Sequence, residues 1–228
     1  MTNRDAVLEH TAGFALLPED TALLVIDMQY ATACRTTGLG RWLQERGRAE
    51  EGRHRFDRIE QLLLPNIARL LALFREEGLQ PVFLRLGGQL HGCRDLLPQL
   101  QELEAAFGNI EGNREFEILE ELAPRPGEPV LTKLSSSGFT SSGLDALLRN
   151  LRARSLVLTG VSTSQCVDLT ARDAADRGYQ ALVVEDAVAE DRPDYHAWTL
   201  EQFQRLFGRV ATTDEVLGEL ASRLGQAA

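Results

Sequence analysis

Short apolar runs that alternate with helix-like segments constrain this chain most. Residues 22–27 (ALLVID) are almost continuously apolar up to the aspartate, as strands are when a parallel sheet buries both of their faces. Residues 58–77 instead repeat apolar side chains at i, i+3 and i+4 spacing and stop at Gly78, which predicts an amphipathic helix. Because strands alternate with helices along the chain, the sequence predicts a parallel sheet with helices on both faces.

The same alternation continues to the end of the chain. Further strands are expected at residues 81–86, 129–133, 155–158, 179–185 and 209–211, and further helices at 144–153, 193–207 and from Asp214 onward. A length of 228 residues with 43% apolar content is enough for one full-sized core. We therefore expect a single α/β domain at residues 21–228, preceded by an N-terminal arm at residues 1–20 whose role the sequence does not indicate.

Composition excludes several classes of function. The formal net charge of −10, with no long basic run, argues against nucleic acid or an anionic membrane as a partner. No run of ~18 apolar residues and no signal-peptide core occurs. The three cysteines, Cys34, Cys93 and Cys166, are too few and too widely spaced for a disulfide framework. These features predict a cytoplasmic protein.

Cys166 occupies a position suited to a nucleophile. A strand (LVL, 156–158) leads into Thr159-Gly160-Val161-Ser162, and a helix is expected to begin near Ser164, so that Cys166 falls in its first turn. Free backbone N–H groups and the positive end of the helix dipole would stabilise a thiolate there and offer donors to an oxyanion. The alternative is that Cys166 is a small buried hydrophobic residue, as free cysteines often are.

Three motifs resemble those of the isochorismatase-like cysteine hydrolases, which include nicotinamidase, N-carbamoylsarcosine amidase and the ureidoacrylate, biuret and triuret hydrolases. They are ALLVIDMQ, PVLTKLSSSGF and GVSTSQCV followed by TARDAADRGY, and a downstream GYQALVVEDAVA supports them. The likeness extends over about residues 21–220. It implies a catalytic set of Asp27, Lys133 and Cys166. Without that context, Asp27 could cap a turn and Lys133 could be an exposed strand-end lysine.

The resemblance also implies a fold and a layout of the site. The family's fold is a three-layer α/β/α sandwich with six parallel strands in the order 3-2-1-4-5-6, which places Asp27 and Cys166 on adjacent strands at the topological switch point. The Val161–Ser162 peptide is expected to be cis, with the backbone N–H groups of Ser162 and Cys166 as oxyanion donors. Tyr30, Phe139 and Gln165 are the expected substrate-binding residues, although Tyr30 could equally be a packing aromatic.

A metal site is not expected. Nicotinamidases carry an Asp-x-His pair and a further histidine after the second strand, whereas this chain has Gly87, Gly88 and a single His91, with Cys93 nearby. Catalytic zinc needs about three protein ligands. We therefore expect a metal-independent enzyme without a cofactor. His196, which would suggest a Cys-His pair, lies inside a predicted helix and is interpreted as structural.

Two long segments are harder to interpret. Residues 31–57 are polar and rich in arginine and glycine with little periodicity, and we expect a lid or partner-contact loop there. Residues 94–128 are acidic, and Glu115, Glu117, Glu120 and Glu121 are expected on a solvated helical face; Asn109, Asn113 or Glu117 could approach the pocket. The resemblance and the length of the first segment predict a homodimer or homotetramer.

These observations predict a cysteine hydrolase that cleaves a C–N bond of a small amide or ureide, such as a biuret-like, triuret-like or N-carbamoyl compound, through an acyl-enzyme on Cys166. Two alternatives remain. One is an isochorismatase-type vinyl ether hydrolase that uses the aspartate without a cysteine nucleophile, and the other is a non-catalytic binding protein on the same fold.

Overall fold

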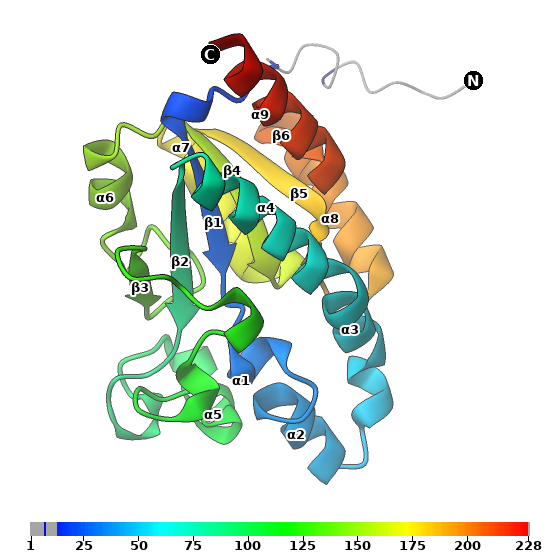
Figure 1. Ribbon diagram of the computed structural model, residues 1–228. Coiled ribbons are helices and arrows are strands. Elements are labelled where there is room, and N and C mark those ends of the chain that lie inside the picture. The colour runs from blue at the N-terminus through cyan, green and yellow to red at the C-terminus, as the bar shows by residue number, and fades with distance from the viewer. Residues whose placement is uncertain (1–6, 8–12, 228) are drawn as a thin grey trace.

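A six-stranded, all-parallel sheet forms the centre of the molecule (Figure 1), in a computed structural model that describes residues 7 and 13–227. The strands are β1 (Thr21–Ile26), β2 (Gln80–Leu86), β3 (Val130–Lys133), β4 (Ser155–Val161), β5 (Gln180–Ala189) and β6 (Gly208–Ala211). They are hydrogen-bonded in the order β3-β2-β1-β4-β5-β6. The predicted fold class and strand order are confirmed.

Helices cover both faces of the sheet. One layer contains α3 (Arg53–Arg58), α4 (Leu64–Glu76) and α9 (Thr213–Ala227), and the other contains α6 (Leu144–Asn150), α7 (Asp168–Asp176) and α8 (Pro193–Leu206). Alternate residues of β1 serve the two layers: Leu23 and Val25 pack with α4, whereas Leu24 and Ile26 pack with α6 and α7. This alternation explains why the strand is apolar at every position.

Three short helices lie beyond the carboxyl ends of the central strands. They are α1 (Tyr30–Ala33), α2 (Gly38–Glu45) and α5 (Pro98–Phe107), and Figure 1 shows them below the arrowheads of β1 and β2. In an open α/β sheet, ligands bind at this edge. Within the described residues, no helix has the length and apolar character needed to cross a membrane.

The expectation of a loop at residues 31–57 is wrong, because most of this segment is helical. It forms α1, α2, a 3₁₀ turn (Ala49–Gly52) and α3. Helix α2 has an apolar stripe of Leu39, Trp42 and Leu43 that its glycines and arginines conceal, and Trp42 packs edge-on against Phe107 at a centroid distance of 5.8 Å. The segment is therefore part of the packed body and not a loop.

Two other segments differ from the helices predicted for them. The helix expected at 58–77 begins five residues earlier, because α3 continues through a π-helical turn (Ile59–Leu63) into α4. The expected acidic helical face at 115–121 is instead two 3₁₀ turns, Arg114–Phe116 and Glu120–Leu122, each anchored by one buried side chain. These turns are too short to show a helical period.

The end of the predicted N-terminal arm packs against the domain. Residues 1–6 and 8–12 lie outside the described residues. Leu16 is fully buried in the core, and its backbone N–H donates to Glu219 of α9 at 2.7 Å. A 3₁₀ turn, Pro18–Asp20, then leads into β1.

Glycine is required where β4 passes β1. Gly160 has a φ of +112°, and a Cβ atom there would lie 1.9 Å from the backbone oxygen of Ile26. A side chain would thus combine an unfavourable backbone conformation with overlap against a buried strand. Because Gly160 is two residues before Ser162, the path of the chain into the candidate site depends on this contact.

We predict that Gly160→Ala lowers the free energy of unfolding by about 2 kcal/mol or more. Gly218→Ala is the matched control, because Gly218 lies in α9 with open space around its Cα. This change should stabilise the protein by up to ~1 kcal/mol. Urea titrations of the two variants measure both values, and equal stability would contradict the close approach of β4 to β1.

Candidate active site

Three strands bring Asp27, Lys133 and Cys166 together at the carboxyl edge of the sheet. Asp27 directly follows β1, Lys133 is the last residue of β3, and Cys166 lies in the π-helical turn Thr163–Val167 that follows β4. Lys133 Nζ lies 2.8 Å from Asp27 Oδ2 and 3.3 Å from Cys166 Sγ. Since β2 separates β3 from β1, the lysine side chain must span the position of β2 to make these contacts.

Asp27 is held in a strained backbone conformation. Its φ is +52°, in the left-handed region that aspartate tolerates better than most residues. Its N–H donates to Leu84 O at 2.9 Å, and its carbonyl accepts the Thr32 hydroxyl at 2.5 Å. The carboxylate is buried, and apart from the ion pair with Lys133 neither oxygen accepts a hydrogen bond from the described residues. It is therefore available to take a proton from a neighbouring group.

Burial sets the protonation state of the other two groups. Desolvation, reinforced by the charge of Asp27, raises the pKa of the Cys166 thiol to about 12 despite the nearby ammonium of Lys133. Burial acts to lower the pKa of Lys133, but attraction to Asp27 and Cys166 holds it above its usual value. Burial thus favours a neutral thiol at Cys166 in the unliganded protein, which opposes the stabilisation of a thiolate expected from the helix N-terminus, while Lys133 keeps its ammonium.

The turn that carries Cys166 begins with a cis peptide between Val161 and Ser162, as the resemblance to the family implied. Side chains from distant parts of the chain hold this turn. Arg55 Nη1 of α3 donates to Ser162 Oγ at 2.7 Å. Glu190, which follows β5, accepts the backbone N–H and the hydroxyl of Ser164 on one oxygen, at 2.8 and 2.6 Å. The start of the helix is thus fixed from two sides.

His196 supports the same turn and does not contact the thiol. Burial and the neighbouring Arg58 lower the pKa of His196 to about 4, so the imidazole is neutral at physiological pH. Arg58 Nη2 donates to its Nε2 at 3.3 Å, which leaves Nδ1–H to donate to Thr163 Oγ1 at 3.0 Å. This arrangement agrees with the structural role inferred from the sequence.

A cavity of about 150 Å³ opens beside the three groups. Its wall includes Asp27, Cys166, Arg55 and Glu104 among polar residues, and the apolar residues Leu39, Leu86, Leu100, Leu103 and Phe107. Pockets that hold drug-sized molecules have volumes of roughly 300–1,000 Å³. The cavity therefore suits a small molecule.

The predicted substrate-binding residues differ in placement. Gln165 lines the cavity. Tyr30 does not, because its ring packs under the guanidinium of Arg114 at 4.5 Å. Phe139 packs in the core against Tyr179, with ring centroids 5.7 Å apart, and is also absent from the wall. Tyr30 was assigned to the pocket from its position just after the strand that ends at Asp27, and Phe139 was assigned by resemblance; each ring instead packs against the partner named above.

Two buried charged residues of the cavity were not predicted. Arg55 is 3% exposed and Glu104 is 4% exposed, although such residues are rarely buried without a reason. Arg55 lies in the segment expected to be a loop, and Glu104 lies in the acidic stretch expected to be solvated. Nothing in the sequence separates either residue from the exposed charges beside it.

In the segment after β2, which was expected to lack metal ligands, Cys93 and His91 lie in different environments. Cys93 is fully buried, with Sγ 3.7 Å from Asn109 O, while His91 is exposed in a 3₁₀ turn. Within residues 7 and 13–227, no three or more His, Cys, Asp or Glu side chains are grouped so that they could hold a metal ion.

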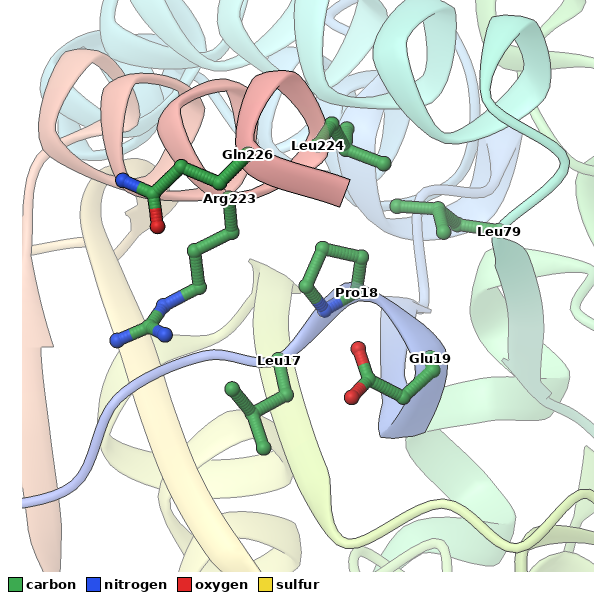
Figure 2. Close-up of a pocket in the computed structure, with 7 residues that line it drawn as sticks. All are labelled: Leu17, Pro18, Glu19, Leu79, Arg223, Leu224 and Gln226. Carbon is green, nitrogen blue, oxygen red and sulfur yellow. The ribbon is translucent and has the colours of Figure 1, made fainter. Parts of the chain in front are cut away.

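A second hollow lies at the opposite edge of the sheet. Figure 2 shows it between the segment before β1, Leu79 before β2 and the end of α9. Its volume is about 440 Å³, and Glu19 and Arg223 are the charged residues of its wall. Although it is larger, none of its wall residues is a nucleophile, and it lies at the amino ends of the strands, away from Asp27 and Cys166.

Comparison with known proteins agrees with the geometry. The family model described as the isochorismatase domain matches residues 21–215. A ureidoacrylate amidohydrolase RutB of Variovorax paradoxus (strain S110) is 32% identical over 222 residues, which cover 91% of this chain and 84% of that protein. The corresponding protein of Serratia proteamaculans (strain 568) is 30% identical over 231 residues, covering 94% and 88%.

Solved structures share the fold. A cysteine hydrolase from Pseudomonas syringae pv. phaseolicola 1448A has a TM-score of 0.75 at 24% identity, covering 93% of this chain and 98% of that chain. The N-carbamoylsarcosine amidase from Thermoplasma acidophilum has a TM-score of 0.62 at 26% identity, covering 86% and 97%. The family model matches most of the chain and the curated relatives match it almost from end to end, so this chain belongs to the isochorismatase family.

Proposed function

We propose that this protein is a cysteine amidohydrolase that cleaves a C–N bond of a small amide or ureide through a covalent acyl-enzyme on Cys166. The observation that carries the proposal is the position of Lys133 Nζ, which contacts both Asp27 Oδ2 and Cys166 Sγ at the wall of a small cavity. The names of its relatives, a ureidoacrylate amidohydrolase and an N-carbamoylsarcosine amidase, support the same class of bond.

Acylation begins from a neutral thiol. Asp27 accepts the thiol proton while Cys166 Sγ attacks the substrate carbonyl carbon, so that a C–S bond forms as the S–H bond breaks. The backbone N–H groups of Ser162 and Cys166 would bind the resulting oxyanion. Asp27 then returns the proton to the leaving nitrogen as the C–N bond breaks, which leaves an acyl or carbamoyl thioester and frees the amine.

Deacylation uses the same groups in reverse roles. Asp27 takes a proton from water, the hydroxide attacks the thioester carbonyl, and the thiolate that leaves recovers the proton from Asp27. Lys133 remains protonated throughout, because its pKa is raised, and it stabilises the carboxylate and the transient negative charge on sulfur.

Assembly into a homodimer or homotetramer and a cytoplasmic location remain predictions from the sequence.

Replacement of Cys166 by alanine should abolish turnover and leave the fold intact. The change removes one sulfur atom, and the loss of a nucleophile lowers kcat by about 10⁴-fold or more. Release of ammonia from a panel of amides and ureides measures activity, and circular dichroism measures folding. Cys34→Ser is the control, since Cys34 does not line the cavity. Full release of ammonia by the Cys166 variant would contradict a covalent intermediate on Cys166.

The raised pKa of Cys166 predicts how its alkylation depends on pH. Below a pKa of about 12, the thiolate fraction falls about tenfold for each unit that the pH falls. The rate at which iodoacetamide labels Cys166 should therefore rise continuously from about pH 6 to about pH 10 in the unliganded protein. Mass spectrometry of the Cys166 peptide, in a Cys34→Ser background, measures this rate. A plateau beginning near neutral pH would show a resting thiolate.

Activity should survive exhaustive chelation. The proposed steps assign the proton transfers to Asp27 and the charge stabilisation to Lys133 and backbone donors, so that no Lewis acid is required. Assays after dialysis against a strong chelator, together with elemental analysis for zinc, iron and manganese, provide the measurement. Activity lost on chelation and restored by one of these metals would contradict the prediction.

A further inference from the structure

Glu104 is a buried carboxyl group that the proposed mechanism does not use. It lies in α5, is 4% exposed, and lines the same cavity as Asp27 and Cys166. A carboxyl group with so little access to water needs hydrogen-bond donors, because burial without them is costly. The hydrogen-bond donors that surround the Glu104 carboxyl group therefore indicate its role.

One oxygen of Glu104 is satisfied by the protein. Asn109 Nδ2 donates to Glu104 Oε2 at 2.8 Å. The orientation of the Asn109 amide is fixed, because its Oδ1 accepts Gln29 Nε2 at 3.1 Å. Gln29 is fixed in turn by Leu86, whose N–H donates to Gln29 Oε1 at 2.9 Å. A chain of buried amides therefore directs an N–H group at Oε2.

The other oxygen has no such partner. Among residues 7 and 13–227, no group donates a hydrogen bond to Glu104 Oε1, and no cation lies within ion-pair distance of this carboxyl. Arg55, which lines the cavity, is already paired with Asp191, and Lys133, which is buried behind Asp27 and Cys166, is paired with Asp27. Burial, with a contribution from the charge of Asp27, raises the pKa of Glu104. A donor supplied by a ligand would complete its hydrogen bonding.

We propose that Glu104 is a specificity-determining residue that binds an N–H donor group of the substrate, a carbamoyl NH₂ or an ammonium, remote from the bond that is cleaved. The proposal rests on the proposed function and names the substrate class: small amides or ureides whose far end carries an N–H donor and no carboxylate. A carboxylate at that end would face an acceptor oxygen. The apolar neighbours Leu100, Leu103 and Phe107 leave the carboxyl as the polar feature of the α5 wall.

The test compares two ligands of the same size. N-carbamoylglycinamide and N-carbamoylglycine differ only in that a carboxamide NH₂ replaces a carboxylate oxygen. Isothermal titration on the Cys166→Ala protein measures binding without turnover. We expect the carboxamide to bind at least about tenfold more tightly. Tighter binding of the carboxylate, as Arg55 would favour, or no measurable binding of either ligand, would overturn the proposal without the need for a further variant.

The Glu104→Gln variant provides a more specific test, because it replaces the acceptor oxygen that faces the cavity with a donor group. Asn109 still donates toward this position, so the carbonyl of the introduced amide would face Asn109 and its NH₂ would face the cavity. The preference should therefore invert in favour of N-carbamoylglycine. Glu102→Gln is the matched control, since Glu102 is an exposed glutamate on the same helix and does not line the cavity; its preference should equal that of the parent.

The outcomes separate this proposal from the proposed function. An unchanged preference in the Glu104→Gln protein, with circular dichroism that matches the parent, would overturn the role of Glu104 even if the enzyme with Cys166 hydrolyses both compounds. Conversely, the expected binding preference and its inversion, without hydrolysis of any amide by the Cys166 protein, would support the binding role and overturn the amidohydrolase.

Discussion

The buried ion pair between Lys133 and Asp27 is the interaction on which the site depends. Removing both charges from water costs several kcal/mol for each ion, and their attraction offsets this only when the geometry is good. The sheet supplies that geometry, because β3, β1 and β4 end at one edge and the lysine reaches across β2. Loss of either partner would leave an uncompensated charge in the core, so the catalytic pair is also a structural constraint on its surroundings.

The same burial governs the reactivity of the nucleophile. A helix N-terminus favours a thiolate, yet here the carboxylate of Glu190 accepts the N–H of Ser164 and opposes that effect on the turn carrying Cys166. Desolvation and the charge of Asp27 raise the pKa of the Cys166 thiol by more than the ammonium of Lys133 lowers it. In the proposed mechanism, the carboxylate of Asp27 accepts the thiol proton when a substrate carbonyl is present to accept the sulfur electrons.

The α/β class could be predicted from local patterns, because apolar runs alternate with helical periods, whereas the strand order and the set of Asp27, Lys133 and Cys166 came from the resemblance of three motifs to a known family. Doubly buried strands are continuously apolar, and Asp27 directly follows such a strand, whereas Lys133 ends the half-buried β3 and Cys166 lies in the turn after β4. Arg55 and Glu104 could not be predicted, because their burial results from packing between α2, α3 and α5 that no local period reveals. The prediction of a loop at residues 31–57 was wrong for a related reason. The glycines and arginines of α2 obscure the periodicity of its apolar residues, which include Trp42.

The amides that orient Glu104 have a consequence for how this fold can change. The cysteine turn is held by groups on α3, β5 and α8, whereas the wall opposite it comes from the excursion between β2 and β3, joined through Gln29 and Asn109. Glu104 and its apolar neighbours on α5 are thus carried by a different segment from Cys166, although Arg55 and Gln165 also line the cavity. If Glu104 selects the ligand as proposed, a substitution in α5 would change which small molecule binds while Asp27, Lys133 and Cys166 stay in place, so that this excursion is the region to redesign for a new specificity.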